Sequence, residues 1–224
     1  MKALIFDSGT LINLSMNGLL YLLKELKKTF QGKFIITRQV KKEVVDRPSN
    51  VKRFELGALR IQALIDSKVL EFPSSLNISD SDVEKRTKTL MDKANHLMKA
   101  KNQWIKIVSD AEMSCLAISS ICTEKKIESL ISIDERTTRI LAEKPQDLEK
   151  IISRKLHQKV NLKGEGIKAF KEFRFIRSTE LVYVAFKKNL LRVKGKKALD
   201  AVLYATRFKG SSVSFEEIEA LKKL

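Results

Sequence analysis

The stretch that decides the fold is Ala-Leu-Ile-Phe-Asp-Ser-Gly-Thr-Leu-Ile-Asn-Leu, residues 3–14. It opens with four apolar residues, and the turn residues Ser8 and Gly9 follow directly after Asp7. A short apolar run bounded by turn residues is typical of a buried strand in a parallel sheet. Asp7 is then expected at the carboxyl end of that strand, where open α/β sheets bind their ligands. Because a bare carboxylate is costly to bury, Asp7 should be solvated, hydrogen-bonded or bound to a cation.

The rest of the chain alternates between short apolar runs and segments with helical spacing. Further strands are predicted over residues 34–36, 69–72 and 130–133. Helices are predicted between and after them, over residues 11–30, 37–46, 54–67, 110–121 and 135–143, with a long polar helix within 74–108. This alternation predicts an α/β fold, a parallel sheet with helices on both faces in a three-layer arrangement.

Pro145 marks a change in composition, and we expect a domain boundary there. Residues 146–224 hold 19 Lys and Arg against 9 Asp and Glu, a net charge of +10, whereas residues 1–145 hold 25 against 18, a net charge of +7. Helices are predicted over 178–191 and 196–208, and Ser214-Phe215-Glu216-Glu217 is a capping box that starts a last helix. The second part is therefore predicted to be a basic, mainly helical C-terminal extension. We expect it to hold a nucleic-acid backbone.

The net charge of +17 in 224 residues favours polyanionic partners, nucleic acid first and anionic membrane surfaces second. The alternative is a solvated lysine-rich surface, but 44 Lys and Arg against 27 Asp and Glu exceed what balanced ion-pair networks need. Asp7 interrupts the first apolar run, which argues against a signal peptide, and no window approaches a transmembrane span. Cys115 and Cys122, seven apart on a predicted helix, are expected in the core of a cytoplasmic protein without disulfides.

Four acidic residues could form a site. Asp7 and Asp134 each follow an apolar strand, so both are expected at the same edge of the sheet. Glu43 lies in a predicted helix after the second strand. Considered without the other acids, it is expected to be a solvated residue beside two lysines. Asp110 begins an apolar helix, where an acid is favourable simply through the helix dipole. Together they suit Mg²⁺ or Mn²⁺, which prefer carboxylate and water oxygens. Such ions can activate water for phosphodiester hydrolysis.

In these motifs the chain resembles the PIN-domain family of nucleases, in its archaeal type with a C-terminal extension. The resemblance covers residues 1–145 and rests on Asp7 with Thr10 and Asn13, on Thr-Arg-Gln-Val-Lys-Lys-Glu-Val around Glu43, on Ser-Asp-Ala-Glu-Met-Ser-Cys-Leu-Ala after Val108, and on Leu-Ile-Ser-Ile-Asp-Glu-Arg-Thr-Thr-Arg around Asp134. It implies a metal-dependent endoribonuclease, a hydrolase that binds and cuts RNA. It also implies that Asp7, Glu43, Asp110 and Asp134 are both the catalytic and the metal-binding residues.

The same resemblance gives supporting roles to neighbouring residues. Thr10 would support the first metal shell or a phosphate, and Asn13 belongs to the same motif. Glu112 and Glu135 are nearby substitutes for the third and fourth acids, and Glu112 would point differently from Asp110 on the same helix.

Several alternatives stay open. A PIN-like module could bind RNA or protein without cutting, and a nuclease could be an RNA-processing enzyme or the toxin partner of an antitoxin. A ribosome-associated partner and a homodimer are also compatible with the sequence, and no membrane association is expected. The opening motif also resembles haloacid-dehalogenase-like phosphatases, but Gly9 stands where that chemistry needs a second Asp. A receiver-type domain would need a tandem acidic pair at the first strand.

Overall fold

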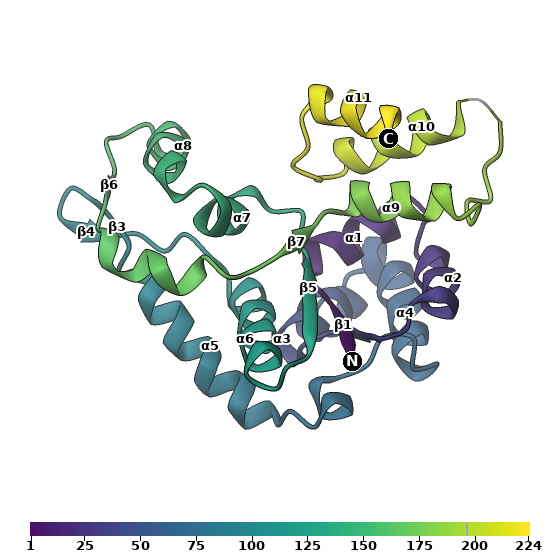
Figure 1. The fold of residues 1–224 in the computed structure, drawn as a ribbon, viewed down its shortest axis with the longest axis horizontal. Helices are drawn as coiled ribbons and strands as arrows, with labels where there is room; N and C mark the ends of the chain where they lie inside the picture. Colours follow the sequence, from purple (N-terminus) through teal and green to yellow (C-terminus); the bar gives the residue numbers. More distant parts are fainter. Residues whose placement is uncertain (196) are drawn as a thin grey trace.

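The computed structural model describes residues 1–195 and 197–224, and it has a four-stranded parallel sheet at its centre (Figure 1). The strand order is β2 (Lys33–Ile35), β1 (Lys2–Phe6), β5 (Glu128–Ser132) and β7 (Phe175–Ile176). β1 is in register with β5 from Lys2 opposite Glu128 to Phe6 opposite Ser132. Both strands therefore end at one edge of the sheet, and the predicted α/β class with a parallel sheet is confirmed.

Helices cover both faces of this sheet. On one face, α6 (Asp110–Glu124) contacts β1 and β5, and α5 (Asp80–Asn95) packs against α6. On the other face, α2 (Tyr21–Thr29) and α9 (Ser178–Lys187) enclose an apolar groove with Leu4 and Phe34 of the sheet. Successive side chains of β1 point to opposite faces of the sheet, and both faces are covered by helices. The apolar side chains of β1 are therefore buried, which explains its continuous apolar sequence.

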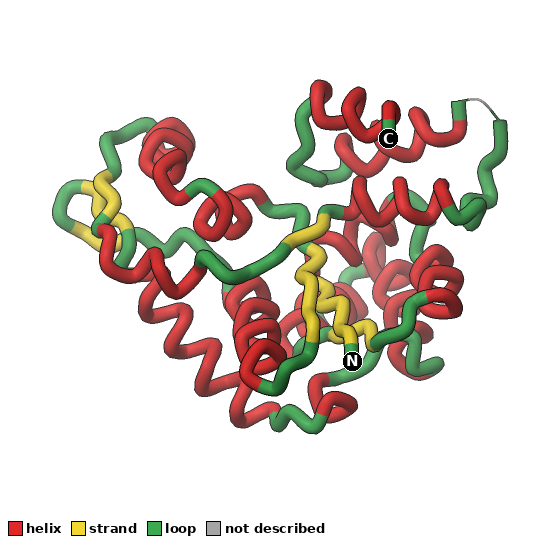
Figure 2. The backbone as a smooth tube through the Cα atoms, viewed as in Figure 1, coloured by secondary structure: helices red, strands yellow, loops and turns green. Residues whose placement is uncertain are grey.

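The remaining helices surround this core (Figure 2). They are α1 (Ser8–Met16), α3 (Arg38–Lys41), α4 (Lys52–Asp66), α7 (Arg136–Glu143), α8 (Leu148–Leu156), α10 (Ala198–Phe208) and α11 (Phe215–Lys223). A π-helical turn, η1 (Lys42–Asp46), continues α3, and short 3₁₀ turns are η2 (Pro48–Asn50), η3 (Pro73–Leu76), η4 (Pro145–Asp147) and η5 (Gly164–Phe170). A small antiparallel sheet of β4 (Gln103–Trp104), β3 (Met98–Ala100) and β6 (Asn161–Leu162) lies at the end of α5.

Both parts of the chain contribute to the same hydrophobic core. Beyond Pro145, β7 extends the parallel sheet and β6 pairs with β3. Buried side chains from 148 to 202 belong to the same cluster as Ile5 and Phe6. Only a small separate cluster of Leu203, Val213 and Ile218 joins α10 to α11. The two parts expected on either side of residue 145 therefore meet in one core.

The structure corrects three local predictions. Residues 69–72 form no strand, since Glu71 alone makes a parallel bridge with Ile35. The helix predicted over 11–30 is two helices, because the chain turns at Gly18, whose φ of +67° suits glycine. The long helix predicted within 74–108 ends at Asn95 and gives way to the β3–β4 hairpin.

Two other features concern the helices. Cys115 and Cys122 are buried free thiols on α6, as predicted. In the described part of the chain, no helix combines the length and apolar character needed to cross a bilayer.

Candidate active site

Asp7 lies at the carboxyl end of β1 and caps α1. Its backbone N–H donates to Ser132 O at 2.9 Å, which extends the β1–β5 pairing, and its Oδ2 accepts the Gly9 N–H at 3.0 Å. The carboxylate is almost fully buried, and its Oδ1 has no hydrogen-bond partner. A Cβ at position 9 would lie 3.2 Å from Asp7 Oδ2 and 3.9 Å from Asp134 Cβ. Both acids therefore lie next to Gly9, and a side chain at this position would contact them. Asp7 and Asp134 thus share one edge of the sheet, as predicted.

The environment of Asp7 disfavours its negative charge. Burial raises its pKa from the ordinary 3.8 to about 7, with further contributions from the charges of Glu112 and Glu43. The Gly9 and Ser8 N–H groups oppose this rise without cancelling it. A buried carboxylate with an unpartnered oxygen and two acidic neighbours is a group that a cation would stabilise.

Glu43 is placed near Asp7 by the π-helical turn that continues α3. Thr37 caps α3, because its hydroxyl accepts the Val40 N–H at 3.0 Å. The extra residue of the π turn η1 then places Glu43 so that its Oε2 accepts the Ser8 hydroxyl at 2.7 Å. Single π turns inside helices are frequent at functional sites. Ser8 was not predicted as a site residue, and nothing in the local sequence marks its bond to a residue 35 positions away.

The third acid held at the site is Glu112, whereas the Asp110 side chain is mostly exposed to solvent. The Asp110 side chain is 70% exposed, and its nearest cation is Lys106 at 3.8 Å. Glu112 is half-buried, and its Oε2 accepts the Ser109 N–H at 3.0 Å and the Thr138 hydroxyl at 2.9 Å. Burial raises the pKa of Glu112, and the charge of Glu135 adds to the rise against these hydrogen bonds. The capping box Ser109–Glu112 is visible in the sequence and could have indicated which acid turns inward.

Glu135 completes the acidic group. It caps α7, and its Oε2 accepts the Thr138 N–H at 2.9 Å. The hydroxyl of the same Thr138 binds Glu112, so Thr138 fixes the positions of both acids.

Three of these acids line an open cleft with a volume of about 760 Å³, whereas the buried Asp7 is not part of its lining. Glu43, Glu112 and Glu135 lie in its wall, and the lining also includes Glu84 and the mostly solvent-exposed Asp110. Five basic side chains line the same cleft, and they are Lys42, Arg47, Lys88, Lys106 and Lys155. Of these, Lys155 alone comes from beyond residue 145. Local sequence does not predict that these cations gather around the acids, because they come from four separate segments of the chain.

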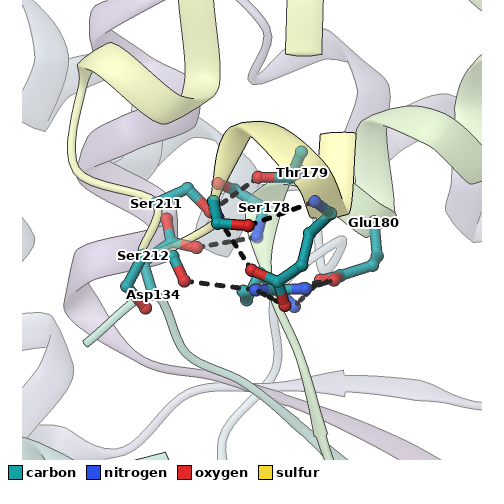
Figure 3. A network of polar contacts seen from close by, with 9 residues as sticks. Asp134, Ser178, Thr179, Glu180, Ser211 and Ser212 are labelled. Carbon is teal, nitrogen blue, oxygen red and sulfur yellow. Dashed lines mark hydrogen bonds and ion pairs between the residues drawn. The ribbon is translucent and has the colours of Figure 1, made fainter. Parts of the chain in front are cut away.

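Asp134 lies beside Gly9, as Asp7 does. It is bound to the C-terminal part of the chain (Figure 3). Its Oδ1 accepts the Ser178 N–H at 2.8 Å, at the start of α9, and its backbone carbonyl accepts the Ser212 N–H at 3.2 Å. Burial raises its pKa, and the charge of Glu180 adds to this. Its Oδ2 is buried without a hydrogen-bond partner. Asp134 therefore has one oxygen engaged in holding α9 and one oxygen without a partner.

The two remaining predicted residues face different surroundings. Thr10 is fully buried beside the strand ends and accepts the Ser132 hydroxyl at 3.2 Å. Asn13 is also buried, but it donates to Thr206 O of α10 at 2.7 Å and accepts from Asn17. Asn13 thus joins α1 to the C-terminal helices.

The donor set fits a hard divalent ion only in part. Within residues 1–195 and 197–224, no three Asp, Glu, His or Cys side chains are grouped closely enough to hold a metal ion together. The unpartnered Asp7 Oδ1 and the nearby Glu43 and Glu112 nevertheless provide the oxygen chemistry that Mg²⁺ or Mn²⁺ requires. Because Mg²⁺ commonly takes only one or two protein carboxylates and completes its shell with water and substrate phosphate, a preformed set of three is not required.

Comparison of the chain with models of protein families, with curated proteins and with solved structures finds no match. The chemistry of the site is therefore inferred from its own geometry.

Proposed function

We propose that the protein is a divalent-metal-dependent nuclease that hydrolyses phosphodiester bonds of RNA. The observation that supports this most directly is the cleft itself, where Glu43, Glu112 and Glu135 face five Lys and Arg side chains. Acids suit the binding of a cation, and the surrounding positive charges suit the binding of a phosphate backbone. The resemblance of residues 1–145 to PIN-domain nucleases points to the same chemistry.

In this proposal Asp7, Glu43 and Glu112 would hold the metal, which would supply neutralisation of charge at the scissile phosphate and activation of water. Glu112 replaces Asp110 in the set expected from the sequence, because Asp110 is turned to the solvent. Ser8 and Thr138 keep Glu43 and Glu112 in place through their hydroxyl groups. The basic side chains of the cleft position the backbone of the nucleic acid.

A second candidate is a PIN-like module that binds RNA or a protein without cutting. Two observations favour it. No group of three potential ligands is preformed in the described residues, and Asp134 is engaged with Ser178. In that case the cleft would bind a backbone and its acids would have no catalytic role.

A pair of variants on one helix tests the proposal. Glu112→Gln keeps an acceptor for Ser109 and Thr138 but removes a partly buried charge, whereas Asp110→Asn removes the charge of a mostly exposed side chain in the lining of the same cleft. With labelled RNA and Mg²⁺ or Mn²⁺, we expect Glu112→Gln to lower the cleavage rate by roughly 100-fold or more. Asp110→Asn should stay close to the unmodified protein.

Equal rates for the two variants would remove Glu112 from the site. If the unmodified protein binds RNA but gives no metal-dependent cleavage, the non-cutting module is the correct alternative. Calorimetric titration with Mn²⁺ should also show a site that Glu112→Gln weakens and Asp110→Asn leaves unchanged.

A further inference from the structure

A second pocket lies at the end of α5, outside the acidic cleft. It has a volume of about 640 Å³, and we call it the Trp104 pocket; its walls are formed by Lys93, His96, Lys99, Trp104 and Lys163 with Asp92. The small antiparallel sheet forms part of it, since Lys99 of β3 is paired with Trp104 of β4. Figure 1 shows β3 and β4 at the C-terminal end of α5.

Trp104, the single tryptophan of the chain, is exposed to solvent. Its side chain is 43% exposed, and it lies on a strand of two residues. The Lys99 ammonium lies 4.2 Å from the ring centroid, and the His96 ring meets the indole edge-on at 5.0 Å. His96 is in turn held by Asp92, with Nδ1 3.2 Å from Oδ1. The indole is thus held in a defined orientation and yet remains accessible to a ligand.

The charge of the pocket favours an anion. Lys93, Lys99 and Lys163 form no ion pair with a carboxylate among the described side chains, and Asp92 is the acid in the wall. A flat aromatic face beside several ammonium groups matches a nucleotide, because its base can stack while its phosphate is paired. An acidic peptide would use the lysines but not the face of the indole.

Two chain segments run from the Trp104 pocket to the acidic cleft. Lys106, two residues after Trp104, lines the acidic cleft. Lys88 of α5 lines the acidic cleft, and His96, which directly follows α5, lines the Trp104 pocket, a separation of about 12 Å along the helix axis. One single strand could therefore contact both sites.

We propose that the Trp104 pocket is a binding site for one nucleotide of a single-stranded RNA, with the base stacked on Trp104 and the phosphate held by the neighbouring lysines. The proposal rests on the proposed function for the nature of the ligand. It adds a contact outside the acidic cleft that holds the strand without dependence on sequence, because every base offers a face for stacking.

Because Trp104 is the only tryptophan, its fluorescence reports on the pocket directly. In the full-length protein with EDTA, oligoadenylate should quench the emission in a saturable manner. Trp104→Ala should weaken binding of the same labelled oligonucleotide by about 5- to 150-fold in fluorescence anisotropy, the range of one stacked base. Trp104→Phe should recover most of the affinity.

Phe54 provides a matched control. It is 44% exposed, and the Arg53 guanidinium lies 4.4 Å from its ring centroid, so it resembles Trp104 in exposure and in its cationic neighbour. Phe54→Ala should leave both quenching and affinity unchanged. An abasic oligonucleotide of the same length should bind more weakly to the unmodified protein and to Phe54→Ala.

The proposal would be overturned if Trp104→Ala bound with unchanged affinity and the oligonucleotide did not quench the emission of the unmodified protein. So would equal affinity for the abasic strand, which would identify the pocket as a site for a polyanion such as an acidic peptide. Because EDTA prevents metal-dependent cleavage, these measurements are independent of the Glu112 test. A protein that binds RNA through Trp104 but does not cut would retain this inference and lose the nuclease proposal.

Discussion

At the residue scale, Asp7 carries a charge that the fold disfavours, and this has a consequence for stability. Its pKa rises from 3.8 to about 7 on folding, so between these values the folded protein binds a proton that the unfolded chain does not. The free energy of unfolding must therefore fall as the pH rises through this range. Asp7 alone accounts for a loss on the order of 4 kcal/mol by about pH 8.

Asp7→Asn removes this titration while preserving an acceptor for the Gly9 N–H. In metal-free buffer, urea unfolding should show the variant to be more stable than the unmodified protein at about pH 8, with the difference vanishing near pH 4. Asp110→Asn is the control, since its side chain faces the solvent. At about pH 8, Mg²⁺ or Mn²⁺ should stabilise the unmodified protein but should not stabilise the Asp7→Asn variant. A pH-independent difference between Asp7→Asn and the unmodified protein would contradict a charge-based origin.

How far the site could be predicted depends on whether its contacts are local. The position of Asp7 follows from the apolar strand before it and the turn after it, and both lie within a few residues. The choice between Asp110 and Glu112 was also encoded locally, by the capping box that turns Glu112 inward. The partners of Asp134 could not be predicted, because Ser178 is 44 residues away and is brought there by the sheet.

At the scale of elements, Asp134 links the end of β5 to the start of α9. Ser178 is fully buried, so loss of the carboxylate would leave its N–H without a partner. We expect Asp134→Ala to lower the free energy of unfolding by about 1–3 kcal/mol, and to speed amide exchange in α9. Asp134→Asn keeps the acceptor and should lose much less.

The two Asp134 variants control for each other, because they share the loss of charge and differ in the hydrogen bond. Equal stability of the two would show that the Ser178 contact contributes nothing. If both fold and Asp134→Asn also loses cleavage, the unpartnered Oδ2 belongs to the active site, in addition to the role of Oδ1 in holding α9.

The elements that were predicted and those that were missed differ in the origin of their stability. β1 contains a buried apolar run, and the second half of β5 falls in the apolar run 130–133, so local sequence predicts both strands. β3, β4, β6 and β7 have only two or three residues each. β6 and β7 exist because distant segments pair, as Leu162 does with Met98, and β4 is held only by its hairpin with β3. Residues 69–72 have the composition of a strand, but only Glu71 aligns with Ile35. Local composition does not encode such pairings.

At the scale of the whole molecule, the distribution of charge matters more than its total. The extension was expected to carry the nucleic-acid backbone, yet four of the five basic residues in the acidic cleft, Lys42, Arg47, Lys88 and Lys106, come from the first part of the chain. Deleting the extension would also remove β7 and buried residues of the common core, so the deletion would not test its role. Substitutions of charge in the intact protein are the appropriate test.

Two triple variants with the same change in net charge would provide this test. Lys88→Gln, Lys106→Gln and Lys155→Gln remove charge from the acidic cleft, whereas Lys24→Gln, Lys68→Gln and Lys125→Gln remove it from exposed positions elsewhere. If the three cleft lysines each neutralise one phosphate, the slope of log affinity against log salt should become shallower by about 2, at roughly 0.7 for each phosphate of a single strand. The control variant should keep the original slope and lose affinity only weakly through the general field. Equal slopes for the two variants, measured by anisotropy with EDTA, would show that RNA responds to the overall positive charge and not to the acidic cleft.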